Sequence, residues 1–266
     1  MINFKLRELD KIVPWGEGKE LSLHWFALTD GDLWLTFGCN TIYEYSQEAL
    51  LEFEGKESQY NDYYIVRFLE DFSHLFEKIS ESIPERFYNR TENIKLFKDN
   101  AQKWLDIYET DEDEYSDFYF DEYDKLISWT TERSFDSGHL IGGPYLYFFR
   151  HNGKIRIVWE TECILENGVS VWTANDGSLE MNYTDFVSEV KSFGEAFFIA
   201  MDKQIDLAIE KNWTEVKLDK IRLLEEHKER KLEFEKKLSF LDQNMEDGQN
   251  WEATEDLYKR MQREIK

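Results

Sequence analysis

Residues 145–159 of the chain read YLYFFRHNGKIRIVW. Two runs rich in aromatic and β-branched residues, 145–149 and 155–159, stand on either side of the dipeptide Asn152-Gly153. Asn-Gly readily adopts the positive φ angles of a tight two-residue turn, and between two such runs it is the strongest short-range signal for a β-hairpin. The stretch therefore predicts two antiparallel strands near the middle of the chain.

The residues that follow continue the β pattern. A second Asn-Gly, at 167–168, separates the short apolar run 163–165 from the run 169–172. Asp176-Gly177 offers one more turn before residues 179–181. Together with the first hairpin, these signals predict a central meander of three or four strands.

The N-terminal portion also has a strand pattern. Residues 2–6 alternate between apolar and polar side chains, as expected of a half-buried strand. Residues 21–29 and 33–39 flank Asp30-Gly31, which predicts two strands joined by a tight turn. We therefore expect a small antiparallel sheet before the central meander.

Most of the remaining sequence has the apolar periodicity of amphipathic helices. Apolar residues recur every three or four positions, which places them on one face of each helix. After residue 210 two further helical patterns, broken at Asp247-Gly248, predict a helical hairpin. The expected fold is α+β: antiparallel sheets packed with helices form a body over residues 1–210, and a C-terminal helical hairpin extends it over residues 211–266. The expected body helices cover residues 65–83, 91–108, a segment ending at Trp129, and 184–208.

The charge of the chain is strongly negative. It contains 32 Lys and Arg against 56 Asp and Glu, a net charge of −24, and residues 1–210 alone carry −23. Direct binding to nucleic acid phosphates or to an anionic membrane needs clustered cations and is therefore not expected. The charge instead favours fast encounter with a basic protein partner.

Residues 106–124 form the most distinctive segment. Ten of them are acidic and none is Lys or Arg, and Tyr and Phe are interleaved with the acids. Aromatic residues are enriched at the centres of protein interfaces, and the carboxylates would suit a basic groove. A solvated acidic loop leading into a helix with core-facing aromatics is the competing interpretation. The candidate partner-binding residues are Asp111, Glu112, Asp113, Glu114, Tyr115, Asp117, Tyr119, Asp121, Glu122 and Tyr123.

No motif indicates an enzyme. The chain has no GxSxG, Walker loop or GxGxxG pattern, and we expect neither a cofactor nor a metal site. A hydrolase that uses His24, His139 or His151 with nearby acids is kept as an alternative, although a structural role for each histidine is favoured. The N-terminus lacks a signal-peptide pattern, and no stretch approaches the roughly 18 apolar residues of a membrane span, so cytoplasmic residence is expected.

Several short strings carry a family resemblance. Trp15-Gly16, the string LHWFALTDG at 23–31, Gly142-Gly143-Pro144 and Trp172-Thr173-Ala174 are similar to an uncharacterised bacterial family of unknown function. The resemblance covers about residues 1–210 and leaves the helical tail outside. It implies no activity and no catalytic residue.

These observations favour a non-enzymatic bacterial binding protein. The leading hypothesis is an immunity protein that inhibits a cognate toxin by occluding its active site with an acidic aromatic surface. The alternative is a subunit of a bacterial defence or regulatory complex that docks through the C-terminal helices. The same helices could also form a homodimer.

Overall fold

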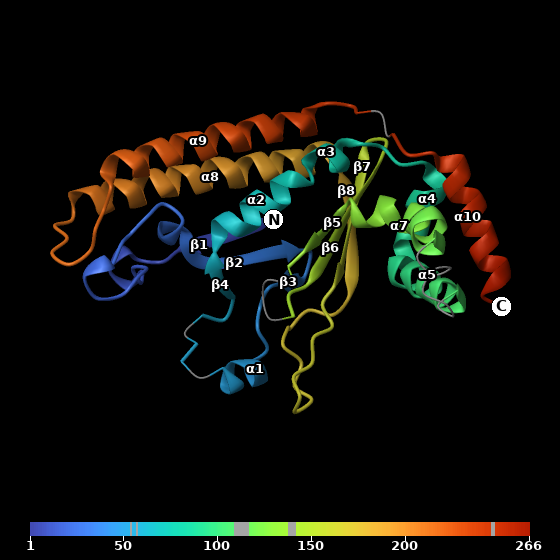
Figure 1. Cartoon of the computed structure of the whole chain (residues 1–266), viewed down its shortest axis with the longest axis horizontal. Helices are drawn as coiled ribbons and strands as arrows, with labels where there is room; N and C mark the ends of the chain where they lie inside the picture. The colour runs from blue at the N-terminus through green and yellow to red at the C-terminus, as the bar shows by residue number, and fades with distance from the viewer. Residues whose placement is uncertain (54, 57, 109–116, 138–141, 246–247) are drawn as a thin grey trace.

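The computed structural model describes residues 1–53, 55–56, 58–108, 117–137, 142–245 and 248–266. Within them lie two antiparallel sheets of four strands each, surrounded by helices (Figure 1). The α+β class and a central antiparallel meander are confirmed, but the runs 163–165 and 169–172 form no named strand and meet only in an isolated bridge between Ile164 and Ser170. The strands are β1 (Ile2–Leu6), β2 (Asp30–Phe37), β3 (Asn40–Ile42), β4 (Asn61–Tyr64), β5 (Ser134–Asp136), β6 (Tyr145–His151), β7 (Lys154–Glu160) and β8 (Gly177–Asn182).

In the first sheet, β1 pairs with one edge of β2, and β3 and β4 pair with the other. The turn predicted at Asp30-Gly31 is wrong, because both residues lie inside β2. Residues 27–29 form a short 3-10 helix, η3 (Ala27–Thr29), in place of a strand. Gly31 is required there because a Cβ atom would lie 2.3 Å from the backbone oxygen of Lys5 on the neighbouring strand. The glycine thus permits close strand pairing and does not make a turn.

The second sheet has the order β5-β6-β7-β8 and contains the predicted hairpin. Asn152 has a φ of 50° at its turn, as the Asn-Gly signal requires. Alternate residues of β6 and β7 point to opposite faces, and both faces are buried. Leu146 and Phe148 pack into the larger core, whereas Tyr147 and Phe149 pack into a second core on the other side.

The larger core lies between the sheets and the long helix α8 (Tyr183–Glu210). Helices α2 and α3 occupy the sequence predicted as one helix, which is interrupted at Leu75. The bounds of the other elements on this side are α1 (Gln47–Glu52), α2 (Ile65–His74), α3 (Phe76–Ser80), α9 (Lys220–Leu238) and the short 3-10 helices η1 (Leu9–Lys11), η2 (Gly18–Glu20) and η6 (Ser239–Asp242).

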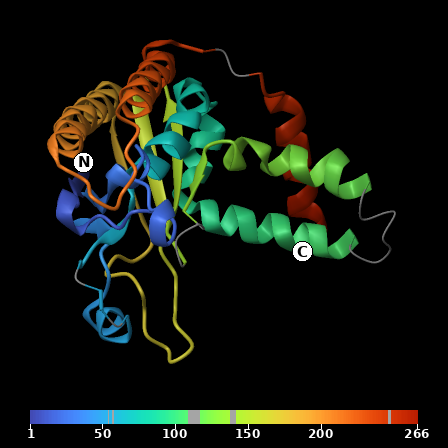
Figure 2. The same ribbon diagram turned by 60° about the vertical axis from the view of Figure 1, so that its left-hand side comes forward.

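A group of helices projects from the other face of the second sheet (Figure 2). We call it the helical lobe. Its core is aromatic and includes Phe87, Trp104 and Trp129, all fully buried. The lobe consists of α4 (Glu85–Arg90), η4 (Thr91–Asn93), α5 (Ile94–Tyr108), the π-helical turn η5 (Tyr119–Tyr123), α7 (Asp124–Thr131) and α10 (Trp251–Glu264).

The C-terminal region is helical, as expected, but its two helices have different partners. Helix α9 packs along α8 and α2, and the pair α8–α9 forms the helical hairpin (Figure 1). Gly194 in α8 allows this approach, because a Cβ atom there would lie 2.2 Å from the Phe234 ring. Helix α10 instead joins the helical lobe and packs on α5 and α7. Residues 211–266 are therefore divided between the two cores of the molecule.

Candidate interaction surface

The acidic aromatic segment lies at the end of the helical lobe. Five of the predicted partner-binding residues, Asp111 to Tyr115, fall outside the described residues. The remaining predicted partner-binding residues begin at Asp117, which is exposed, and continue into η5. The C-terminal end of α5 and the start of η5 lie at the end of the lobe away from the sheet (Figure 2).

The π-helical turn determines which aromatic residues of this segment are buried and which are exposed. Phe118 and Tyr123 are five positions apart and both buried, 6% and 8% exposed, as the i to i+5 spacing of a π-helix allows. Phe120, between them, is 65% exposed. Tyr119 is half-buried and its ring lies 5.4 Å from that of Tyr123. The aromatics therefore divide between core and surface, and Tyr123 contributes to the core.

The acids of the segment divide in the same way. Glu122 forms an ion pair with Arg260 of α10, so its charge is compensated within the chain. Asp121 is exposed and has Lys125 at 3.6 Å. A surface pair of this kind contributes little and leaves the carboxylate accessible. We define the acidic tip as the exposed residues at this end of the lobe, Asp106, Ile107, Asp117, Phe120, Asp121 and Asp124.

Helix α10 contacts the end of α5 that carries part of the acidic tip. The Glu264 carboxylate accepts hydrogen bonds from Trp104 Nε1 at 2.7 Å, from Tyr108 Oη at 2.9 Å and from Arg260 Nε at 2.8 Å. Burial disfavours the charged form of Glu264, but these donors outweigh it and lower its pKa. Near the start of α10, Glu255 binds Arg90 of α4 through two hydrogen bonds, which also lower the pKa of this carboxyl group.

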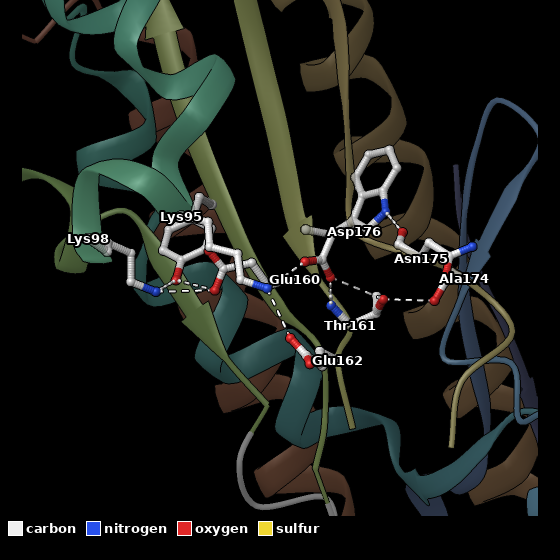
Figure 3. A network of polar contacts seen from close by, with 10 residues as sticks. Lys95, Lys98, Glu160, Thr161, Glu162, Ala174, Asn175 and Asp176 are labelled. Atoms are coloured by element: carbon white, nitrogen blue, oxygen red, sulfur yellow. Dashed lines mark hydrogen bonds and ion pairs between the residues drawn. The ribbon is translucent and has the colours of Figure 1, made fainter. Parts of the chain in front are cut away.

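A polar network fastens the lobe to the sheet (Figure 3). Lys98 of α5 donates hydrogen bonds to Tyr147 Oη and to Glu160 Oε2, the latter at 3.2 Å. Burial and the neighbouring Glu160 raise the pKa of Tyr147, so the hydroxyl stays protonated and donates to Glu160 Oε2 at 3.4 Å. The sequence analysis missed these residues, although Glu160 interrupts an otherwise apolar strand end.

The second half of the network lies at the ends of β7 and β8. Lys95 pairs with Glu162 at 3.0 Å and with Asp176 at 3.1 Å. Burial disfavours ionisation of Asp176, but hydrogen bonds from Thr161 and Lys95 outweigh this and lower its pKa. Two lysines, Lys95 and Lys98, thus bind three carboxylates, and these contacts fix α5, and hence the acidic tip, relative to the sheet (Figure 3).

The histidines of the hydrolase alternative do not form a common site in the described structure. His24 contacts the Trp15 ring, with centroids 4.3 Å apart, beside the first sheet. His151 ends β6, and its Nδ1 lies 2.8 Å from the Ile83 oxygen. His139 lies outside the described residues. Among the residues that the structure describes, no group of three or more His, Cys, Asp or Glu is arranged to hold a metal ion.

Comparison with known proteins matches residues 1–257 to a family of unknown function (DUF5984). The chain therefore belongs to this family. The match extends beyond the expected boundary near residue 210 and includes α9, so the C-terminal helices are not wholly an addition to the family fold. No curated protein and no solved structure matches the chain. No helix in the described ranges is long and apolar enough to cross a bilayer.

Proposed function

We propose that the chain is a non-enzymatic bacterial protein that binds a basic protein partner through the acidic tip. The exposure of Phe120 carries the proposal: a 65% exposed phenylalanine stands beside the exposed carboxylates of Asp117, Asp121 and Asp124. A single exposed apolar side chain is common on protein surfaces, but beside several exposed carboxylates it supplies the apolar anchor that a binding surface for a basic partner needs. π-helical turns such as the one that presents Phe120 are also frequent at functional sites.

The carboxylates and the apolar side chains of the acidic tip contribute to different steps of binding. The net charge of −24 attracts a basic partner over long range and raises the association rate. After contact, Phe120 and Ile107 bury apolar area, which slows dissociation. The network around Lys98 and the hydrogen bonds to Glu264 of α10 hold the acidic tip on helices that are fixed to the rest of the protein. Little conformational entropy is therefore lost on binding.

The partner we propose is a toxin whose active site is lined by Lys and Arg. The tip carboxylates would pair with these cations, and Phe120 would fill the pocket between them, so that substrate is excluded. In this role the chain is a cytoplasmic immunity protein that inhibits its cognate toxin by occlusion. Carboxylates would then stand where the anionic groups of the substrate bind.

The test is affinity purification of the tagged full chain from its native host, followed by mass spectrometry. The proposal predicts a stoichiometric basic protein at about 50 mM salt that is largely lost at about 500 mM, because salt screens the interaction. The variant Phe120→Ala, Asp117→Lys, Asp121→Lys should fail to retain it. A matched control is Leu51→Ala, Glu48→Lys, Glu52→Lys on α1, where an 83% exposed leucine also stands beside exposed acids. Equal recovery with both variants would refute the role of the tip.

A further inference from the structure

Helix α9 carries an unusual stripe on its outer face. Ile221, Glu225, Lys228 and Leu232 follow one another at spacings of four, three and four, which places them in one line along the helix. Ile221 is 72% exposed and Leu232 is 55% exposed. Leu224, 51% exposed, lies beside the line. We call the four aligned residues the α9 stripe.

The stripe faces away from the body of the protein. The opposite side of α9 is buried through Leu223, His227 and Phe234, which belong to the helix's packing on α8 and α2. Aliphatic side chains as exposed as Ile221 and Leu232 do not pack in the core and so contribute little to the stability of the fold. Helix α9 lies along the outer edge of the fold, on the far side of α8 from the first sheet (Figure 1).

Helix α9 differs in charge from the rest of the chain. The helix carries seven Lys and Arg against five Glu, in a chain whose net charge is −24. The net charge of the chain makes two copies repel one another, and the net positive charge of α9 reduces this repulsion along the helix. Glu226, Glu229 and Glu233 are paired within α9 itself. Within the described part of the chain, Glu225 and Lys228 have no ion-pair partner.

The order of residues in the stripe is self-complementary. Read in either direction it runs apolar, charged, charged, apolar, with opposite signs at the two central positions. Two stripes packed antiparallel about a two-fold axis between residues 226 and 227 would place Ile221 on the partner's Leu232 and Glu225 on the partner's Lys228. Each contact then occurs twice, as a two-fold interface requires. We propose that this stripe is the interface of a homodimer.

This inference is independent of the proposed function, because the stripe and the acidic tip lie on different elements. A contact along one helix is smaller than the interfaces of obligate dimers, so the dissociation constant should be about micromolar or weaker. The dimer would present two acidic tips. A bivalent partner would then gain avidity without any additional contact.

The experiment is sedimentation velocity of the full chain over a range of concentrations. The wild type should pass from monomer to dimer as concentration rises, and Leu232→Glu should weaken dimerisation by at least about tenfold, since it buries an unpaired charge. Leu51→Glu, on the 83% exposed leucine of α1, is the matched control and should dimerise like the wild type.

Charge exchange tests the register. Glu225→Lys alone and Lys228→Glu alone should each weaken the dimer, because like charges then face one another. The double variant Glu225→Lys, Lys228→Glu should restore it, because the pairs form again with their signs exchanged. A chain that is monomeric at all concentrations would overturn the proposal. So would a dimer that Leu232→Glu leaves intact, or one whose charge variants the double exchange does not restore.

Discussion

Trp25 Nε1 donates a 3.0 Å hydrogen bond to His227 Nδ1, although the two residues are 202 positions apart. An indole N–H can only donate, so Nδ1 must accept and Nε2 must carry the proton of a neutral imidazole. That proton is donated to Asp202 Oδ1 at 2.9 Å. The arrangement explains why a tryptophan stands in the LHWFALTDG string: it joins the N-terminal part of the body to α9 and α8.

The first prediction concerns pH. Burial lowers the pKa of His227 despite the opposing influence of Asp202, so the unfolded chain takes up a proton at a higher pH than the folded chain. Between the two pKa values the unfolded state binds more protons. The contribution of His227 to the free energy of unfolding should therefore be complete above about pH 7 and fall as pH drops through the ordinary histidine pKa of about 6.5. Urea unfolding at a series of pH values measures this.

His227→Gln is the informative variant for that measurement. Glutamine can accept from Trp25 and donate to Asp202 but does not titrate, so the fall in stability below about pH 6.5 should become shallower. It should not vanish, because burial also lowers the pKa of His24. A pH dependence identical to that of the wild type would contradict the assigned tautomer and contacts.

The second prediction concerns Gly31. Alanine at this position should destabilise the protein by about 1–3 kcal/mol, because its Cβ would press on the backbone of β1, which cannot move without breaking the sheet. Gly153→Ala is the control, since a Cβ there meets nothing within 4 Å. Thermal unfolding of the two variants compares them. Similar stability for both would show that β1 and β2 are not in close contact.

The third prediction concerns the buried ion pair between Arg133 and Glu81. The side chains are 1% and 6% exposed, and Arg133 Nη2 lies 2.6 Å from Glu81 Oε2. Glu81→Ala leaves a buried guanidinium without this partner and should cost about 3–5 kcal/mol. The double variant Glu81→Ala, Arg133→Met should be more stable than the single one in urea unfolding. The pair would have no structural importance if the single variant unfolded like the wild type.

Local signals predicted those elements of the fold that local physics determines. The Asn152-Gly153 hairpin formed because φ preference and strand propensity agree there. Asp30-Gly31 carries the same kind of signal, but the close approach of Lys5 from another strand decides its conformation. A sequence pattern holds no information on that approach. The packing of α9 and α10 in two different cores could likewise not be predicted from the sequence, because an apolar helix face does not identify the surface that covers it.

The candidate site was predictable in composition but not in exposure. The ten acids and the aromatics of residues 106–124 are evident in the sequence. A π-helical turn shifts the helical phase by one residue, and no regular period predicts that Tyr123 is buried while Phe120 is exposed. Arg260, which neutralises Glu122, comes from a helix 138 residues farther along the chain.

The proposed function requires that the acidic tip makes the productive encounter with a basic partner. The most direct test is the association rate constant, measured by stopped-flow fluorescence with the partner recovered by affinity purification. At about 50 mM salt, the variant Phe120→Ala, Asp117→Lys, Asp121→Lys should associate about 10–100-fold more slowly than the wild type, with a smaller difference at about 500 mM. The α1 control variant should lose much less. Equal rates for the tip and α1 variants at low salt would show that the acidic tip does not make this encounter.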